Sequence, residues 1–168
     1  MNNTKTKGIL IFICGKMGAG KSTKSKNLAR DRNGVLLSED EWLTSLYPEL
    51  ISSFDDYLKY SALMKPLLKE HVRRILEVGA NVVMDFPANT TRQREWFKEI
   101  ASESKTQHEL IYIDASDELC LRQISERRTK QPERANFDTE SMFYEVTKYF
   151  EAPSKNEGLN ILIEKRNA

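Results

Sequence analysis

The sequence predicts an α/β protein in which helices cover both faces of a parallel sheet, and three observations support this fold class. Short apolar runs rich in β-branched residues recur, as in residues 9–14 and 81–85, and such runs are typical of strands buried on both faces. Helical patterns separate the runs, which is the alternation expected of parallel strands joined by crossover helices. The 168 residues contain no repeat or linker and are enough for one core, so we expect a single domain over residues 1–168.

Each expected element follows from its own residues. Strands are expected at residues 9–14, 35–37, 81–85, 109–114 and 159–163, where apolar side chains run together. Helices are expected at residues 22–32, from Asp40 onward, and at 56–78, 91–104, 117 to about 128 and 139–150, from good helix formers or from apolar spacings of three and four.

Capping and breaking residues set the boundaries of these helices. Asn33-Gly34 is a C-terminal signal for the first helix, Gly79 ends the long one, and Ser116 with two acids after it begins the fifth. Pro66 either begins the long helix or kinks it. Thr129 to Phe137 has no periodic pattern and is expected to form a mobile loop.

The residues that follow the strands are expected to lie together. In parallel sheets covered on both faces, ligands bind beyond the carboxyl ends of the strands. This geometry predicts that Gly15 to Ser22, Asp40, Asp85 and Asp114 lie along one edge of the sheet.

Composition limits the classes of partner. Lys and Arg number 26 and Asp and Glu 25, so no overall basic field favours unspecific binding to nucleic acid or to an acidic membrane. The basic start of the chain is followed by an apolar run of only six residues, too short for a signal core or a membrane span, and we expect a cytoplasmic protein. Cys14 and Cys120 have no metal-binding spacing and are expected to be buried.

One motif stands between the first strand and the first helix. CGKMGAGKST, residues 14–23, contains two glycines at a spacing of five followed by Lys21 and Ser22. The expected nucleotide-binding residues are Gly15, Lys16, Met17, Gly18, Ala19, Gly20, Lys21, Ser22 and Thr23. Glycines let several backbone amides point at one anion, and the helix start adds partial positive charge. Lys21 can then reach the β and γ phosphates and the Ser22 hydroxyl can coordinate Mg²⁺, so the motif predicts a nucleoside triphosphate site.

With four further stretches, the chain resembles the P-loop kinases, specifically the AAA-domain group of predicted kinases. The motifs that carry the resemblance are GKMGAGKST, LSEDEWL, VVMDFPANTTRQREWF, IYIDASDELCLRQISERR and TKYFEAPSKNEGLNIL, which together cover most of the chain. Relatives of the group include chloramphenicol phosphotransferase, polynucleotide 5′-kinases and zeta-toxin-like kinases.

The resemblance implies a P-loop NTPase fold of three layers, α/β/α. Its five-stranded parallel sheet would have the kinase-type strand order 2-3-1-4-5, with a small lid at about residues 127–138. It also implies phosphoryl transfer from ATP with Mg²⁺, and it leaves the acceptor open.

Two aspartates are the candidate acids of the reaction. A kinase needs a carboxylate that takes the proton of the acceptor hydroxyl, and Asp40 is our candidate for this base. Because Glu39 and Glu41 flank Asp40, the position of the base is ambiguous by one residue. On the alternative interpretation, Asp40 only caps a helix. Asp85 ends a strand, where its carboxylate is expected near the Mg²⁺ in the Walker-B arrangement, and it is the alternative base.

Arginines near the predicted lid are the candidate charge stabilisers. Arginine is always charged and donates two parallel hydrogen bonds, which suits the phosphoryl oxygens in transfer. Arg127 is the expected catalytic arginine, Arg122 and Arg128 are expected to bind the nucleotide, and Arg134 lies in the loop. On the alternative interpretation these residues only compensate the dipole of a helix C-terminus.

Further residues are weaker candidates. In the family-like stretch FPANTTRQR we expect Asn89 to contact the acceptor and Arg94 a phosphate, or else to be a turn residue and a solvated charge. Trp42 and Tyr47 either line an acceptor pocket or pack in the core. Tyr149 and Phe150 likewise either flank the adenine or pack in the core.

Three functions are compatible with a phosphate-binding loop. A GTPase-like switch needs a guanine-reading Asn-Lys-x-Asp motif, which the sequence lacks, and a mechanical AAA ATPase needs a longer chain. The leading hypothesis is therefore an ATP-dependent kinase that moves the γ-phosphoryl group of Mg-ATP to a hydroxyl of a small molecule. Alternatives are a polynucleotide 5′-hydroxyl kinase, for which nucleic acid is a possible but not favoured partner, or a P-loop NTPase with a regulatory role. We expect a monomer or a dimer and no membrane partner.

Overall fold

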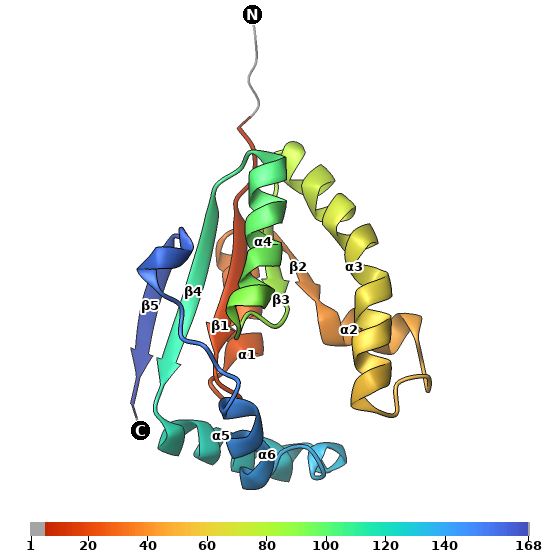
Figure 1. Cartoon of the computed structure of the whole chain (residues 1–168), viewed down its shortest axis with the longest axis vertical. Coiled ribbons are helices and arrows are strands. Elements are labelled where there is room, and N and C mark those ends of the chain that lie inside the picture. The colour runs from red at the N-terminus through yellow and green to blue at the C-terminus, as the bar shows by residue number, and fades with distance from the viewer. Residues whose placement is uncertain (1–5, 168) are drawn as a thin grey trace, which may run out of the picture.

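The computed structural model describes residues 6–167 and is built on a five-stranded parallel sheet (Figure 1). The strands are β1 (Leu10–Gly15), β2 (Gly34–Ser38), β3 (Asn81–Asp85), β4 (His108–Ala115) and β5 (Ile161–Arg166). Their order across the sheet is β2-β3-β1-β4-β5, which confirms the predicted fold class and strand order. Residues 1–5, part of the basic start of the chain, lie outside the described residues.

Six α-helices are present in the described chain. They are α1 (Lys21–Asp31), α2 (Glu39–Leu46), α3 (Phe54–Glu77), α4 (Thr91–Ser104), α5 (Asp117–Lys130) and α6 (Glu140–Thr147), with short 3₁₀ turns at Pro132–Arg134 and Lys155–Glu157. Among residues 6–167 no helix is long and apolar enough to cross a membrane.

The predicted helices are all present, and their ends differ in instructive ways. Pro66 lies inside α3, which begins at Phe54 because Ser53 and Asp56 form a capping box there. The predicted loop at 129–137 is wrong in part, since α5 continues to Lys130 and a 3₁₀ turn follows. Strand β5 extends to Arg166 because it pairs with β4 as far as Ala115, although its last residues are charged.

Two hydrophobic cores lie on the two faces of the sheet. Side chains of β1 alternate, so that Leu10, Phe12 and Cys14 join a core formed with α3 and α4, while Ile11 and Ile13 join a second core. In the second core α1, α5 and α6 contribute buried residues. As Figure 1 shows, α3 and α4 cover the near face of the sheet, and α5 and α6 lie beyond the carboxyl ends of the strands. Both predicted free cysteines, Cys14 and Cys120, are buried.

Candidate active site

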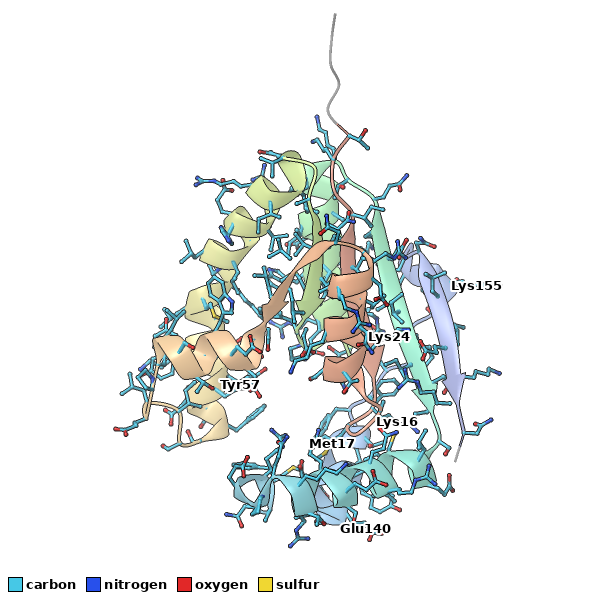
Figure 2. The ribbon with its side chains drawn as sticks, turned by 180° about the vertical axis from the view of Figure 1, so that it is seen from behind. Lys16, Met17, Lys24, Tyr57, Glu140 and Lys155 are labelled. Carbon is cyan, nitrogen blue, oxygen red and sulfur yellow. The ribbon has the colours of Figure 1, made fainter. Side chains whose placement is uncertain are left out.

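A cavity of about 1070 Å³ opens at the carboxyl ends of the strands. It is lined by the loop after β1, the ends of β2 and β3 with the residues that follow them, and the segment from α5 to α6. Figure 2 shows the opening between the start of α3, marked by Tyr57, and the layer formed by α5, with Lys16 and Met17 beside it. Ligand sites are typically about 300–1,000 Å³, so this cavity is large enough for two small ligands side by side.

The loop after β1 has the backbone that the glycine motif predicts. Gly18 and Gly20 have φ of 78° and 93°, a left-handed conformation that other residues rarely adopt. A Cβ on Gly18 would lie 2.6 Å from the carbonyl oxygen of Cys120, so the loop packs directly on α5. At its other end, Gly20 starts α1 without a side-chain cap, and the first turn of α1 has no acidic residue. The N-terminus of α1 is therefore available to bind an anion.

Lys21 folds back onto this loop. Its Nζ donates hydrogen bonds to the carbonyl oxygens of Gly15 (2.6 Å) and Lys16 (2.9 Å). Burial lowers the pKa of Lys21, while the carboxylate of Asp85 acts in the opposite direction. Lys16 forms an ion pair with Asp117 at the start of α5, which holds the outer side of the loop.

The two predicted aspartates line the same cavity. Ser38 at the end of β2 is paired in register with Asp85 at the end of β3, and Asp40 is the second residue of α2. Asp85 is half-buried, and burial raises its pKa. The nearby Ser22 hydroxyl and Lys21 ammonium counteract this effect, whereas the charge of Asp40 adds to it. The structure thus brings Ser22, Lys21 and Asp40 within electrostatic reach of Asp85.

The structure separates Glu39 from its neighbours Asp40 and Glu41. Glu39 is only 5% exposed and accepts hydrogen bonds from Tyr57 Oη and from Ser61 Oγ at 2.9 Å. Both partners belong to α3, so Glu39 joins α2 to α3, and it does not line the cavity. Asp40 and Glu41 are exposed and do line it.

Trp42 and Tyr47 pack against α3 and do not line the cavity. The ring centroids of Tyr47 and Tyr60 are 4.4 Å apart, and those of Trp42 and His71 are 6.3 Å apart. Both aromatic residues adjoin the core on the α3 face. The packing interpretation therefore holds for them, and the exposed aromatic residue on this side of the cavity is Phe54.

The predicted arginines separate into two groups. Arg127 lines the cavity and donates to both oxygens of Asp138, from Nε at 2.7 Å and from Nη2 at 2.5 Å. Arg134 also lines the cavity and donates from Nε to Asp138 at 3.1 Å. Arg122 and Arg128 are exposed and do not line it, so the structure does not bring them to the site.

The phase of α5 explains this separation. The α5 residues that line the cavity are Gln123, Glu126, Arg127 and Lys130, which follow the spacing of one helix face. The side chain of Asp138 is 0% exposed, and its carboxylate forms ion pairs with both Arg127 and Arg134. Burial raises the pKa of Asp138, but hydrogen bonds from Arg127 and Arg134 outweigh burial and hold it below its ordinary value.

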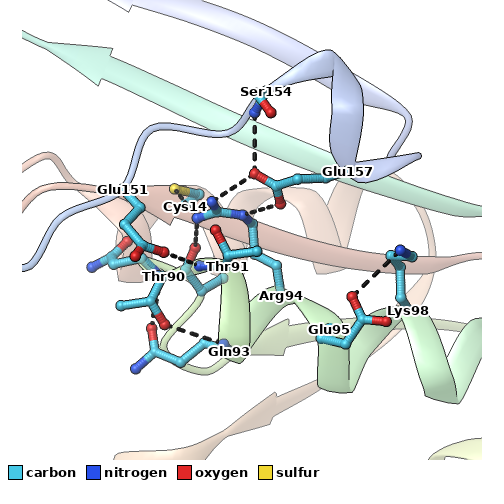
Figure 3. Close-up of polar contacts among 12 residues, drawn as sticks. Cys14, Thr90, Thr91, Gln93, Arg94, Glu95, Lys98, Glu151, Ser154 and Glu157 are labelled. Carbon is cyan, nitrogen blue, oxygen red and sulfur yellow. Dashed lines mark hydrogen bonds and ion pairs between the residues drawn. The ribbon is translucent and has the colours of Figure 1, made fainter.

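Arg94 has a structural role, so both predicted alternatives, a phosphate contact and a solvated charge, are wrong. Its side chain is 0% exposed and binds Glu157 through two hydrogen bonds of 2.7 and 2.8 Å, as Figure 3 shows. A third hydrogen bond of 2.9 Å runs from Nη1 to the carbonyl oxygen of Ala88. Arg94 therefore joins α4 to the segment before β5.

Asn89 lines the cavity and also supports the loop. Its Oδ1 accepts a hydrogen bond from the backbone N–H of Gly15 at 3.0 Å. Tyr149, which is 73% exposed, and Phe150 line the cavity as well. Lys26, Gln123 and Lys130 are further lining residues that we did not predict. The signal for Lys26 was its position one helical turn after Ser22.

Comparisons with known proteins agree with this geometry. A family model described as an AAA domain matches residues 10–153. No curated protein matches the chain in sequence. Among solved structures, a proposed kinase from Chloroflexus aurantiacus superposes with a TM-score of 0.73 at 19% identity, over 95% of this chain and 88% of that one.

Two further structures contain nucleotides or their analogues. The APS kinase CysC of Mycobacterium tuberculosis, in complex with AMPPNP and APS, has a TM-score of 0.63 at 18% identity, over 95% of this chain and 90% of that one. Kti12 of Chaetomium thermophilum, in complex with ADP-AlF3, has a TM-score of 0.64 at 19% identity, over 92% of this chain and 88% of that one. These likenesses establish the fold, and the family match over most of the chain shows that the protein belongs to the AAA-domain family with a P-loop kinase fold.

Proposed function

We propose that the protein is an ATP-dependent phosphotransferase that moves the γ-phosphoryl group of Mg-ATP to a hydroxyl of a small molecule. The observation that carries the proposal is the meeting of a phosphate-binding loop and two aspartates, Asp40 and Asp85, in one cavity large enough for both substrates. A regulatory nucleotide binder needs the loop and a metal ligand, but it does not need a second carboxylate beside an open acceptor space.

The residues at the loop fit a triphosphate. The backbone N–H groups between Gly15 and Ser22 would bind the β-phosphate, and Lys21 would exchange its hydrogen bonds to loop carbonyls for bonds to phosphate oxygens. The desolvated ammonium of Lys21 is well placed for this exchange, because burial disfavours its charge until an anion arrives.

The donor atoms near Asp85 fit Mg²⁺. Within residues 6–167 no group of three or more His, Cys, Asp or Glu residues could hold a metal ion by itself. Mg²⁺ in kinases is commonly held by one or two carboxylates together with phosphates and water, so the Ser22 hydroxyl and the Asp85 carboxylate would suffice. When bound, the ion neutralises phosphate charge and orients the phosphoryl group.

In the transfer step Asp40 would accept the proton of the acceptor hydroxyl. The acceptor oxygen forms a bond to the γ-phosphorus as the bond from that phosphorus to the β,γ-bridging oxygen breaks, and ADP leaves with the electron pair of that bond. Asp40 passes the proton on to solvent. Lys21 and Arg127 would stabilise the negative charge on the phosphoryl oxygens during the transfer.

The segment at about residues 127–138 would act as a lid. It contributes Arg127, Lys130 and Arg134 to the cavity opposite the aspartates, and closure would exclude the water that otherwise hydrolyses ATP. Asp138 would hold the two arginines as one unit during this movement.

The test is a screen for acceptor-dependent ADP release with hydroxyl compounds and 5′-hydroxyl oligonucleotides, repeated with Asp40→Asn. If Asp40 is the base, the variant transfers phosphate at least ~10²-fold more slowly while it binds ATP with nearly wild-type affinity. Asp85→Asn is the matched comparison, because the two carboxylates are alternative bases. The assignment of roles is refuted if Asp85→Asn gives this pattern and Asp40→Asn does not.

A further inference from the structure

The basic residues that line the cavity are confined to one side of it. All its lysines and arginines among the described residues come from the loop with α1 or from the lid side, namely Lys16, Lys21, Lys26, Arg127, Lys130 and Arg134. The lining residues between positions 36 and 93 form what we call the acceptor wall. Among the described residues, this wall contributes the carboxylates Asp40, Glu41 and Asp85 and no lysine, arginine or histidine.

The carboxylates on the two sides also differ in their surroundings. On the lid side, Asp138 is neutralised by ion pairs with Arg127 and Arg134, and Glu126 shares its helix face with Arg127 and Lys130. On the acceptor wall, neither Asp40 nor Glu41 forms an ion pair with any residue in the range 6–167, and both are exposed to the cavity. If Asp85 binds Mg²⁺ as proposed, two negative charges on this wall remain without a cation.

The acceptor wall also presents an apolar surface. Phe54, the first residue of α3, is 71% exposed and lines the cavity, together with Leu36 and Pro87. On the lid side, Phe137 lines the same cavity and is 63% exposed. Figures 1 and 2 show the start of α3 and the segment after α5 on the two sides of the opening. Exposed aromatic side chains on two walls of one cavity are typical of a site for a ligand with a flat apolar part.

We propose that the phosphate acceptor is an alcohol without negative charge, either neutral or amine-bearing, whose apolar part packs on Phe54. This inference rests on the proposed function, since it describes the second substrate of the same cavity. An anionic acceptor would place its charge between the γ-phosphate and the carboxylates of Asp40 and Glu41, and no basic residue of the acceptor wall would compensate. An amine would instead pair with Glu41.

The same charge pattern predicts selectivity against nucleic acid. A 5′-hydroxyl oligonucleotide carries phosphates next to the reacting hydroxyl, and these would need lysine or arginine contacts on the acceptor side. Basic residues of this cavity are on the side that we assign to ATP. The inference therefore separates the small-molecule kinase from the polynucleotide kinase.

The experiment uses alcohols in sets that share one skeleton and differ in charge. One set is 3-phenylpropane-1,2-diol, phenylalaninol and 3-phenyllactate, which are neutral, cationic and anionic; others are the hexoses glucose, glucosamine and glucuronate, and the pair adenosine and adenosine 3′-monophosphate. A 5′-hydroxyl oligonucleotide completes the panel. Transfer is measured as acceptor-dependent ADP release together with labelled product from γ-labelled ATP.

The expected result is transfer to neutral or cationic alcohols, with kcat/KM on the order of tenfold or more above that of the anionic member of the same set, as expected for one unit charge near two carboxylates. Transfer that favours the anionic members or the oligonucleotide overturns this inference but leaves the proposed function standing. Absence of transfer to every class, from a protein that binds ATP, overturns both.

A charge reversal tests the wall directly. Glu41→Lys should raise the kcat/KM ratio of anionic to neutral acceptors by about tenfold, because it places a cation beside the reacting hydroxyl. Glu77→Lys is the matched control, since it makes the same change of charge at an exposed site outside the cavity and should leave the ratio unaltered. Equal ratios in wild type and Glu41→Lys, with both proteins folded, would overturn the assignment of the acceptor wall.

Discussion

The pair of Arg94 and Glu157 makes a stability prediction that can be worked out from its contacts. The Arg94 side chain is 0% exposed and that of Glu157 is 11% exposed, and two hydrogen bonds join them. Glu157→Gln keeps the shape of the side chain but removes its charge, which leaves a buried guanidinium with neutral partners such as the carbonyl oxygen of Ala88. Breaking a buried ion pair from one side costs about 3–5 kcal/mol.

We expect Glu157→Gln to lower the free energy of unfolding by about 3 kcal/mol, the lower end of that range, because the glutamine oxygen still accepts one hydrogen bond from Arg94. For a chain of this size, that loss lowers Tm by roughly 6–12 °C. The measurement is urea unfolding followed by circular dichroism, supported by a thermal scan. Lys148→Gln is the control, since it removes a surface charge whose partner, Glu145, is also exposed.

The double variant Arg94→Met with Glu157→Gln separates the ion pair from simple packing. Methionine occupies much of the same volume without a charge, so the double variant should be more stable than Glu157→Gln alone. If Glu157→Gln costs less than 1 kcal/mol, or if the double variant is the least stable of the set, the reasoning from the buried guanidinium is refuted.

The same pair also predicts a pH dependence. Hydrogen bonds from Arg94 hold the pKa of Glu157 below its ordinary value, so in the folded state this carboxyl is ionised to lower pH than in the unfolded chain. Its stabilising contribution is therefore complete above the unfolded pKa of about 4.3 and is lost as pH falls through the folded pKa. The wild type should lose more stability between about pH 5 and pH 3 than Glu157→Gln does.

Three further variants test the candidate site. Lys21→Ala should abolish ATP binding measured by calorimetry without unfolding the chain, and unaltered affinity would contradict the loop assignment. Arg127→Gln should lower the rate of phosphoryl transfer by at least ~10-fold, whereas Arg122→Gln, on another face of α5, should not change it. Equal effects in the two variants would contradict the proposed role of Arg127. Gly18→Ala should lower the free energy of unfolding by at least about 1–2 kcal/mol and weaken ATP binding, because the residue has φ of 78° and its Cβ would meet the carbonyl of Cys120. A wild-type Tm with wild-type affinity for ATP would show that the loop has another backbone conformation.

The parts of the site that local spacing determines could be predicted from the sequence. A strand, a glycine turn and a helix start within residues 10–23 leave one arrangement for the loop, and a carboxylate at the end of a buried strand emerges at the ligand edge, as Asp85 does. The strand order, in contrast, came from the family resemblance.

The parts of the site that depend on helix phase or on partners distant in sequence could not be predicted. Asp40 and Glu39 are neighbours in sequence, but one helical step turns Glu39 toward Tyr57 on α3. Arg94 has its partner at Glu157, which is 63 residues away along the chain, and no local pattern encodes that pair. Buried arginines are rare, so a charge in a helix was reasonably interpreted as solvated or functional.

The order of the strands explains why different segments of the chain build the two sides of the cavity. The loop after β1 lies between β3 and β4 in the sheet, so segments that follow β2 and β3 can reach only one side of it, and α5, which follows β4, reaches the other. The pairing of Ser38 with Asp85 fixes the acidic side by backbone register, whereas residues 39–54 follow the last paired residue of β2. Substitutions such as those at Glu41 or Phe54 can therefore change which alcohol is accepted without disturbing the hold on ATP. This topology predicts that a variant at either position has an altered acceptor preference and an unaltered affinity for ATP.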